Sequence, residues 1–250
     1  MDNNNVFEQE FTVLSYLSDC NSKLAPHYLL LMMQEVAWGH VEKHHIGWSY
    51  LAEKNQFWAL IRLHVQIERM PEWNETIKLR TWGKNPEGIS HFRDHEMVDK
   101  DGNIIMCSTS TWVVLDFTNG RPQRLEDYPT YLYTNNQRDA IEEHVPKIKK
   151  ITMPENGLLY KPVVFSDIDV NQHVNNSKYL QFALDAFPID YVKTHRLTEF
   201  FINFNHQAKE GDDYSVYSQE IAPNNFTSVI CLKERNTEVA IISTKWNLIC

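Results

Sequence analysis

The chain contains two related halves, and this internal repeat limits its fold more than any other feature of the sequence. The clearest identities pair Asp19 with Asp169 and Trp112 with Trp246. Three pairs of blocks match in the same order along the chain, namely residues 18–36 with 168–186, 65–81 with 202–218, and 104–115 with 238–249. A duplication whose loops were later trimmed produces this pattern, so we expect two domains of the same fold.

Each half has the same order of predicted elements. A short strand at Glu10–Tyr16 or Tyr160–Phe165 is followed by a polar turn and then by an apolar helix. We expect the helices at His27–Lys43 and Ser177–Phe187, the second stopped by Pro188. About five segments of alternating polarity follow in each half and predict antiparallel strands. One long helix with such strands is typical of the α+β class, with a curled sheet wrapped around the helix.

The two domains are expected to be joined by a polar linker. We place the N-terminal domain at 1–117, the linker at 118–157 and the C-terminal domain at 158–250. The linker contains four prolines and, in our prediction, a short helix at 136–143.

The charge of the chain argues against nucleic-acid or anionic-membrane binding, since the formal net charge is −9. The main exception is the basic run Val145–Lys150, which follows three upstream arginines, Arg121, Arg124 and Arg138. No signal peptide and no apolar run of membrane-spanning length are found. The four cysteines are scattered, which indicates reduced thiols in a cytoplasmic protein. His40 and His44 have metal-ligand spacing without an evident third ligand, so a solvated helix end is the preferred interpretation.

The most suggestive polar run is DIDVNQHVNNSKYL at 167–180, directly before the second predicted helix. If this stretch is extended, Asp169, Asn171 and His173 point to one side. A helix N-terminus offers free N–H groups to a developing oxyanion, and histidine transfers protons near neutral pH. The alternative is a set of turn and capping residues.

The first half provides an internal comparison for this run. It keeps Asp19 and Asn21 but has Lys23 where the second half has His173. The shared Asp and Asn can therefore be partly a device of the fold, whereas the histidine distinguishes the second half. We expect a single active site, built on the second half.

With these residues identified, the chain resembles the acyl-acyl carrier protein (acyl-ACP) thioesterase family, whose members are tandem hot-dog proteins. The resemblance extends over residues 7–249 and is strongest in the motif at 167–179. It implies hydrolysis of fatty acyl-ACP to free fatty acid and holo-ACP, with acyl-phosphopantetheine-carrying ACP as partner and neither cofactor nor metal. The plastid transit peptide of the plant enzymes is not found, so the resemblance points to a bacterial, cytoplasmic protein.

The resemblance also assigns roles to individual residues. The catalytic group comprises Asp169, Asn171, His173 and Gln207, and the substrate-binding group comprises Asn175, Asn176 and Tyr179. Capping is the alternative for the two asparagines, and core packing for Tyr179. Gln207 and Ala208 stand where the plant enzymes have glutamate and cysteine. Alanine cannot be a nucleophile, so we expect direct attack by water.

Two other functions compete with this one. A hot-dog acyl-CoA thioesterase would prefer CoA to the carrier protein, and a non-catalytic acyl-thioester-binding protein would release no thiol. Because a tandem hot dog already contains two such domains, both a monomer and a homodimer are consistent with the sequence.

Overall fold

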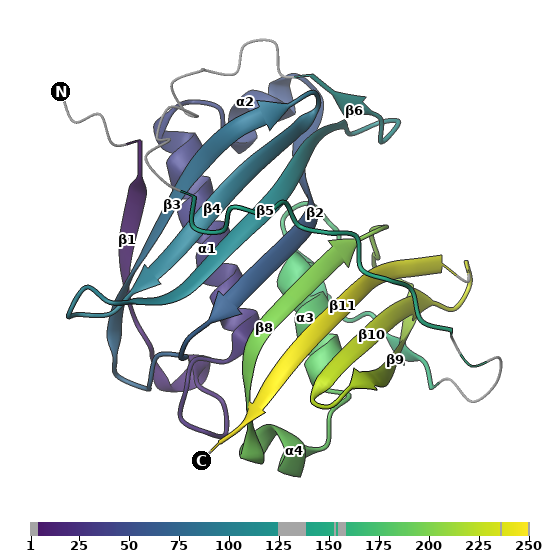
Figure 1. The fold of residues 1–250 in the computed structure, drawn as a ribbon. Coiled ribbons are helices and arrows are strands. Elements are labelled where there is room, and N and C mark those ends of the chain that lie inside the picture. Colours follow the sequence, from purple (N-terminus) through teal and green to yellow (C-terminus); the bar gives the residue numbers. More distant parts are fainter. Residues whose placement is uncertain (1–4, 125–138, 153, 155–158, 236, 250) are drawn as a thin grey trace. The chain divides into compact units, whose positions relative to one another are not determined.

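The computed structural model describes residues 5–124, 139–152, 154, 159–235 and 237–249, and its ribbon is shown in Figure 1. The chain divides into two compact units, one formed by 1–25 and 31–145, the other by 26–30 and 146–250. Among the described residues, no helix is long and apolar enough to cross a membrane.

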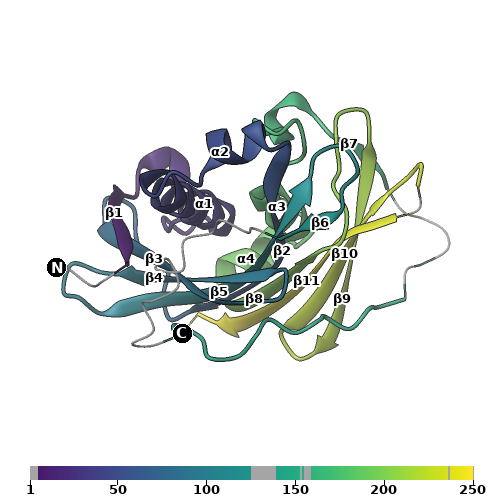
Figure 2. The ribbon, with the colours of Figure 1, turned by 90° about the horizontal axis from the view of Figure 1, so that it is seen from above.

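The first unit is an antiparallel sheet with a long helix on one face. Its sheet has the order β1-β3-β4-β5-β2, with β6 paired to β5. Figure 2 shows α1 lying over β3, β4 and β5. The elements are β1 (Phe7–Thr12), α1 (Pro26–Lys43), α2 (Trp48–Glu53), β2 (Gln56–Ile67), β3 (Thr76–Glu87), β4 (Ser90–Val98), β5 (Ile104–Asp116) and β6 (Pro122–Gln123).

The second unit repeats this plan with a shorter helix. Its sheet has the order β8-β11-β10-β9-β7, and α3 packs against β9, β10 and β11. The elements are β7 (Lys161–Pro162), α3 (Asn176–Leu184), α4 (Ile189–Thr194), β8 (His195–Phe204), β9 (Asp213–Ala222), β10 (Asn225–Leu232) and β11 (Thr237–Leu248). The prediction of one main helix and about five strands per half is confirmed.

The duplication is visible in equivalent side-chain contacts of the two sheets. The indole N–H of Trp112 donates to Ser110 Oγ at 2.9 Å, and that of Trp246 donates to Thr244 Oγ1 at 3.0 Å. Each tryptophan lies next to a register shift, opposite Leu60 in β2 or Leu197 in β8. The repeated blocks therefore fold into repeated structure, which confirms the tandem hot-dog prediction.

Several predicted boundaries are wrong. The second helix ends at Leu184 rather than at Phe187, and Pro188 lies at the start of α4 instead of stopping α3. The first strand lies at Phe7–Thr12, earlier than expected. The strand expected at Tyr160–Phe165 shrinks to two residues because a 3-10 turn begins at Phe165.

The linker helix predicted at 136–143 is also wrong where it can be seen; residues 136–138 lie outside the described part of the chain. Residues 139–143 are not helical because their backbone groups bond to β3 and β4. The Ala140 N–H donates to Asp94 Oδ2 at 2.8 Å, and Lys84 Nζ donates to the Ile141 carbonyl at 3.0 Å. Burial raises the pKa of Asp94 to about 6, although Lys84 lies 3.5 Å away.

The interpretation of His40 as part of a solvated helix end is wrong as well. His40 is buried, and its Nδ1 accepts a hydrogen bond from Arg93 Nη1 in β4 at 3.0 Å. Its ring also contacts His44 edge-on, with the ring centroids 5.1 Å apart. The described residues contain no group of three potential metal-ligating side chains, so the pair is part of the α1–β4 packing.

Candidate active site

The polar run of the second half forms a closed turn rather than an extended strand. The Asp169 N–H donates to the His173 carbonyl at 2.9 Å, and Ile168 pairs with Val174 as an isolated bridge. Gln172 has a φ of 61°, and its N–H donates to the Asp169 carbonyl. The expectation that alternate side chains project from an extended segment does not hold, since the chain reverses direction within this stretch.

Asp169 holds this turn together through its side chain. Its Oδ1 accepts the Asn171 N–H at 2.8 Å, which makes an Asx turn. Asp169, Asn171 and His173 are all half-buried, so each is partly accessible from outside the fold. Asp169 and Asn171 precede His173 by four and two residues, and α3 begins three residues after His173.

The first half builds the same turn. Asp19 Oδ1 accepts the Asn21 N–H at 2.8 Å, and the Asp19 N–H donates to the Lys23 carbonyl at 2.7 Å. Ser22, the counterpart of Gln172, has a φ of 58°. The Asp-x-Asn pair is therefore a device of the fold in both halves, as the sequence comparison suggested.

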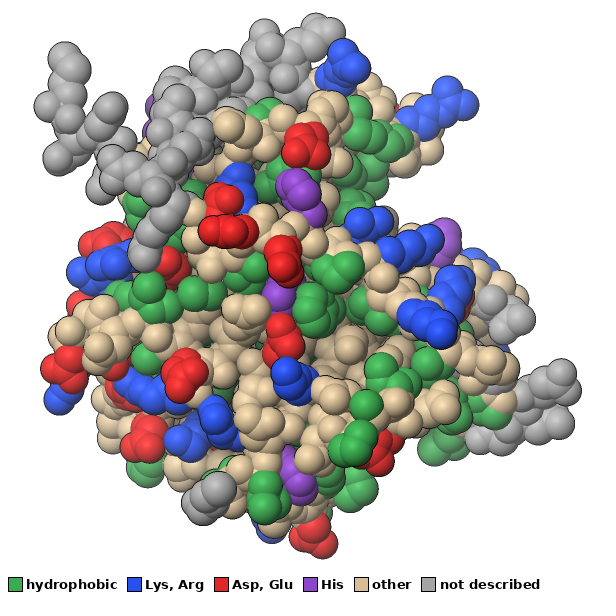
Figure 3. Space-filling model, in the orientation of Figure 1, with side chains coloured by type: hydrophobic (Ala, Val, Ile, Leu, Met, Phe, Trp, Pro, Cys, Tyr) green, Lys and Arg blue, Asp and Glu red, His purple; other side chains and the backbone are tan. Residues whose placement is uncertain are grey.

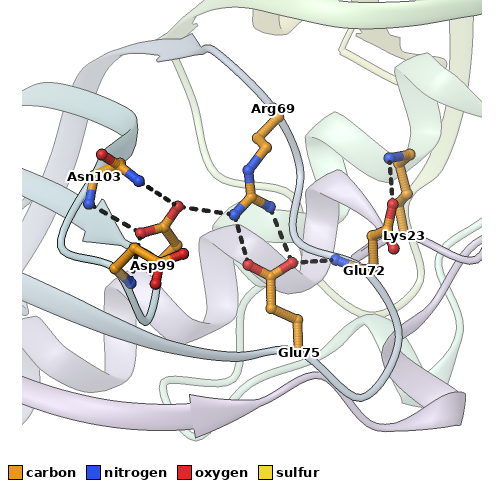
Figure 4. A network of polar contacts seen from close by, with 7 residues as sticks. Lys23, Arg69, Glu72, Glu75, Asp99 and Asn103 are labelled. Carbon is orange, nitrogen blue, oxygen red and sulfur yellow. Dashed lines mark hydrogen bonds and ion pairs between the residues drawn. The ribbon is translucent and has the colours of Figure 1, made fainter.

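The residue that replaces the histidine serves the fold as well. Lys23 forms an ion pair with Glu72 at 3.5 Å, beside an ionic network in which Arg69 binds Glu75 and Asp99 (Figure 4). Arg69 makes two hydrogen bonds to Glu75, at 2.9 and 2.7 Å. Ion pairs therefore connect the segments at this end of the first unit. Lys23, at the position equivalent to His173, takes part in one of them.

The helix after the motif begins at a capping asparagine. Asn175 Oδ1 accepts the Ser177 N–H at 2.9 Å, and the Asn175 N–H donates to the Asp167 carbonyl. The capping interpretation of Asn175 is therefore confirmed. Asn176 is the first residue of α3 and is half-buried.

A distant loop, residues 205–212, brings Gln207 to the motif. The Val174 N–H donates to the Ala208 carbonyl at 2.9 Å, so the residue after His173 is bonded to the residue after Gln207. Gln207 is exposed and Ala208 is buried. This bond connects the Gln207 loop to the motif although the two are far apart in sequence.

Tyr179 lies inside the second unit, with its hydroxyl engaged. It is 2% exposed, and its Oη accepts the Ala208 N–H at 3.0 Å. Burial raises the pKa of this phenol to about 12, so the hydroxyl is neutral at physiological pH. The ring packs edge-on against Phe204 at a centroid distance of 5.8 Å.

Structural roles for two buried carboxylates, Asp167 at the first position of the motif and Asp212 in the Gln207 loop, were not anticipated from sequence. Asp167 Oδ2 accepts the Val164 N–H at 3.0 Å. Asp212 Oδ2 accepts the Lys209 N–H at 2.9 Å and a hydrogen bond from Arg235 at 2.7 Å. Asp212 thereby closes the loop that carries Gln207. The only sequence signal for this role is an aspartate in a glycine-containing turn.

His173 has an unusual hydrogen-bonding state. Its Nδ1 is buried, and no described residue provides it with a hydrogen-bond partner. A hydrogen on Nδ1 would be a buried donor without an acceptor. This costs more free energy than a buried Nδ1 lone pair without a donor. Of the two neutral tautomers, the arrangement therefore favours the one with its hydrogen on Nε2.

Comparison with known proteins agrees with this architecture. Residues 4–133 match the model of the acyl-ACP thioesterase N-terminal domain, and residues 154–248 match that of the C-terminal domain. Oleoyl-acyl carrier protein thioesterase 2 of Arabidopsis thaliana, a chloroplastic protein, is 25% identical over 89% of this chain and 65% of its own length. The chain thus spans about three fifths of the length of the curated relatives first matched.

Solved structures show the same fold over the whole chain. An acyl-ACP thioesterase from Bacteroides thetaiotaomicron superimposes with a TM-score of 0.89 and 25% identity, covering 99% of this chain and 100% of that one. The 12:0-ACP thioesterase from Umbellularia californica has a TM-score of 0.84 and 21% identity, with 98% of each chain covered. Since both of its halves match the corresponding domain models, the chain belongs to the acyl-ACP thioesterase family.

Proposed function

We propose that this protein hydrolyses the thioester of fatty acyl-ACP to free fatty acid and holo-ACP. The observation that carries the proposal is the Val174–Ala208 hydrogen bond, which joins the His173 turn to the Gln207 loop at the start of α3. The first half has the same turn but ends it in the Lys23 ion pair. This difference between the halves supports an active site on the second half.

The mechanism that avoids a buried, unsatisfied Nδ1–H uses His173 Nε2–H as a hydrogen-bond donor. With its hydrogen on Nε2, His173 donates to the thioester carbonyl oxygen as that oxygen becomes negative. Asp169 then accepts the proton of the attacking water, while Asn171 and Gln207 position that water. The water oxygen bonds to the carbonyl carbon, the C–S bond breaks, and the leaving thiolate takes a proton from the site.

The N-terminus of α3 supports this charge distribution. Helix N–H groups and the positive end of the helix dipole stabilise a nearby oxyanion. Among the three residues assigned to substrate binding, Asn175 uses its amide oxygen in the cap, and Tyr179 is buried. We retain Asn176, half-buried at the first position of α3, as the contact to the substrate.

The basic linker segment Pro146–Ile151, here named the strap, is a suitable contact for an acidic carrier protein. Ile148 and Ile151 pack on Val229, Cys231 and Ile241. The Ile148 N–H of the strap donates to Asn203 Oδ1 at 2.6 Å. Asn203 lies near the end of β8, directly before the Gln207 loop.

Its lysines face the solvent. Lys147, Lys149 and Lys150 are all exposed, and only Lys150 has a described ion-pair partner, Glu238. Figure 3 shows Lys and Arg side chains gathered where Figure 1 draws the strap across β11 and β10. On a chain with a formal net charge of −9, such a patch can steer an acidic partner towards the second unit.

The test is thiol release by the purified protein from acyl-ACP and acyl-CoA of several chain lengths. We expect hydrolysis of acyl-ACP that falls by about a hundredfold or more in His173→Ala. Lys23→Ala changes the equivalent position of the first half and is expected to keep the wild-type rate. Preference for acyl-CoA would indicate the CoA thioesterase, and thioester binding without thiol release would indicate the non-catalytic protein. A cytoplasmic, bacterial setting and a monomer or homodimer remain our predictions.

A further inference from the structure

Ala208 is bonded through both of its backbone polar groups to the segment that carries the motif. Its carbonyl accepts the Val174 N–H at 2.9 Å, and its N–H donates to Tyr179 Oη at 3.0 Å. Val174 follows His173 directly, Tyr179 lies on the first turn of α3, and Gln207 precedes Ala208. The Ala208 N–H belongs to the peptide that joins it to Gln207, and its carbonyl belongs to the next peptide. Two consecutive peptide groups after Gln207 are thus bonded to the segment that contains the motif.

The first half has the carbonyl contact without the phenol. The Leu24 N–H donates to the Pro71 carbonyl at 2.9 Å, which is the counterpart of the Val174–Ala208 bond. Pro71 stands at the position of Ala208 and has no N–H to satisfy. At the position of Tyr179 the first helix has Leu29, which offers no acceptor. The half that carries the histidine therefore has a donor–acceptor pair, and the other half lacks both partners.

The second bond is not needed to attach the loop to the turn, because the single Leu24–Pro71 bond attaches the equivalent segments of the first half. The second bond fixes the peptide between Gln207 and Ala208, and with it the position from which the Gln207 side chain leaves the loop. We infer that Tyr179 is a positioning residue, which acts through Ala208 to hold Gln207 beside His173 rather than by touching the substrate. This inference rests on the proposed function.

The chemistry of Tyr179 fits a fixed acceptor. Its burial keeps the phenol neutral, and the ring is held by Phe204 and Phe182, at centroid distances of 5.8 and 6.3 Å. Tyr179→Phe preserves this packing and removes only the acceptor. The matched control is Tyr191→Phe on α4, which removes a phenol that donates to Asn224 Oδ1 at 3.1 Å and has no described contact with the Gln207 loop.

The experiment is a double-mutant cycle of Tyr179→Phe with Gln207→Ala, measured as kcat and KM for acyl-ACP. We expect Tyr179→Phe to lower kcat about tenfold with little change in KM, since small displacements of a positioned group are costly. In the Gln207→Ala background the same change should cost less than twofold, because the group it positions is gone. Tyr191→Phe should leave kcat unchanged.

Additive effects in the cycle, or a Gln207→Ala variant as active as the wild type, would overturn the inference and leave the proposed function intact. Amide hydrogen exchange provides a readout that does not depend on activity. Tyr179→Phe is expected to accelerate exchange at both Ala208 and Val174, and Tyr191→Phe at neither. If the wild type hydrolyses no thioester, the proposed function fails, and unchanged exchange at Val174 would then reject the positioning role separately.

Discussion

Asp169 holds the turn of the motif, and we propose that its carboxylate also activates water; one substitution can separate the two roles. Asp169→Asn keeps an Oδ1 that can accept the Asn171 N–H, so the turn should form as before. It removes the carboxylate that we assign to water activation. We therefore expect kcat for acyl-ACP to fall by about a hundredfold or more, with a melting temperature close to that of the wild type.

Asp19→Asn is the control for this variant, because Asp19 makes the same bond to Asn21 in the first half. It should alter neither the rate nor the melting temperature. An Asp169→Asn enzyme with the wild-type rate would show that Asp169 serves only the turn, and water activation would have to be assigned to another group.

At the residue scale, the sequence predicted those parts of the site that are local in the chain. The Asx turn and the Asn175 cap depend on neighbours within a few residues, and both follow from the side-chain chemistry of aspartate and asparagine. The contact between Ala208 and Tyr179 joins segments almost thirty positions apart. It depends on the register of a loop against a helix, and no local preference of the chain specifies that register.

At the scale of elements, β4 is the least expected strand, because polar side chains are buried on both of its faces. Arg93, Asp94, His95 and Glu96 are all buried, and consecutive side chains of a strand point to opposite faces. His95 Nδ1 lies 3.1 Å from Ser108 Oγ, and burial lowers the pKa of His95 to about 3. As the pH falls, the unfolded chain takes up a proton on this histidine near its usual pKa of about 6.5. The folded protein does so only at a much lower pH.

Stability contributed by neutral His95 is therefore present above about pH 6.5 and is lost as the pH falls towards 3. The expected loss is about 1.4 kcal/mol per pH unit in this window. His95→Asn keeps a partner for Ser108 and does not titrate, so its free energy of unfolding should depend less steeply on pH between 6 and 4. Denaturant titrations across this range measure the slope.

His45→Asn is the matched control, since His45 is exposed and its φ of 58° suits asparagine. Its slope should equal that of the wild type. Asp94 contributes in the opposite direction between about pH 4 and 6, because its pKa is raised. That contribution is common to all three proteins, so equal slopes for His95→Asn and the wild type would contradict the assignment.

The strap gives a second prediction at this scale. Lys147→Glu combined with Lys149→Glu should raise KM for acyl-ACP about tenfold at low salt, and less at high salt because the interaction is screened. Acyl-pantetheine lacks the carrier protein and should be hydrolysed as by the wild type. Lys100→Glu with Lys193→Glu makes the same charge change at exposed positions elsewhere and should leave both substrates unaffected. Equal effects of the two double variants would remove the strap from the proposed interface.

The elements that sequence analysis missed are short or held by distant partners. Helices α2 and α4 have six residues each, too few to show a helical period. The segment 139–143 has a helix-like composition, but Lys84 and Asp94 take up its backbone groups. Long periodic segments were located well because their pattern alone specifies a buried face.

At the scale of the whole molecule, the chain is expected to bind one substrate, at the motif of the second half. A non-hydrolysable acyl-ACP analogue should titrate with one equivalent per chain in calorimetry. Lys23→His should not add a second equivalent, because the first half has Met70 where the second has Gln207, and Leu29 where it has Tyr179. Two equivalents, in the wild type or in this variant, would contradict a single site.

The turn at Asp19–Lys23 has a consequence for the history of the chain. A duplicated domain that carries no reaction keeps only the requirement to fold. If the second half alone hydrolyses the substrate, as we propose, the aspartate and asparagine of the first half preserve the part of the motif that serves the turn. Lys23 then stands at the position where that half needs no histidine.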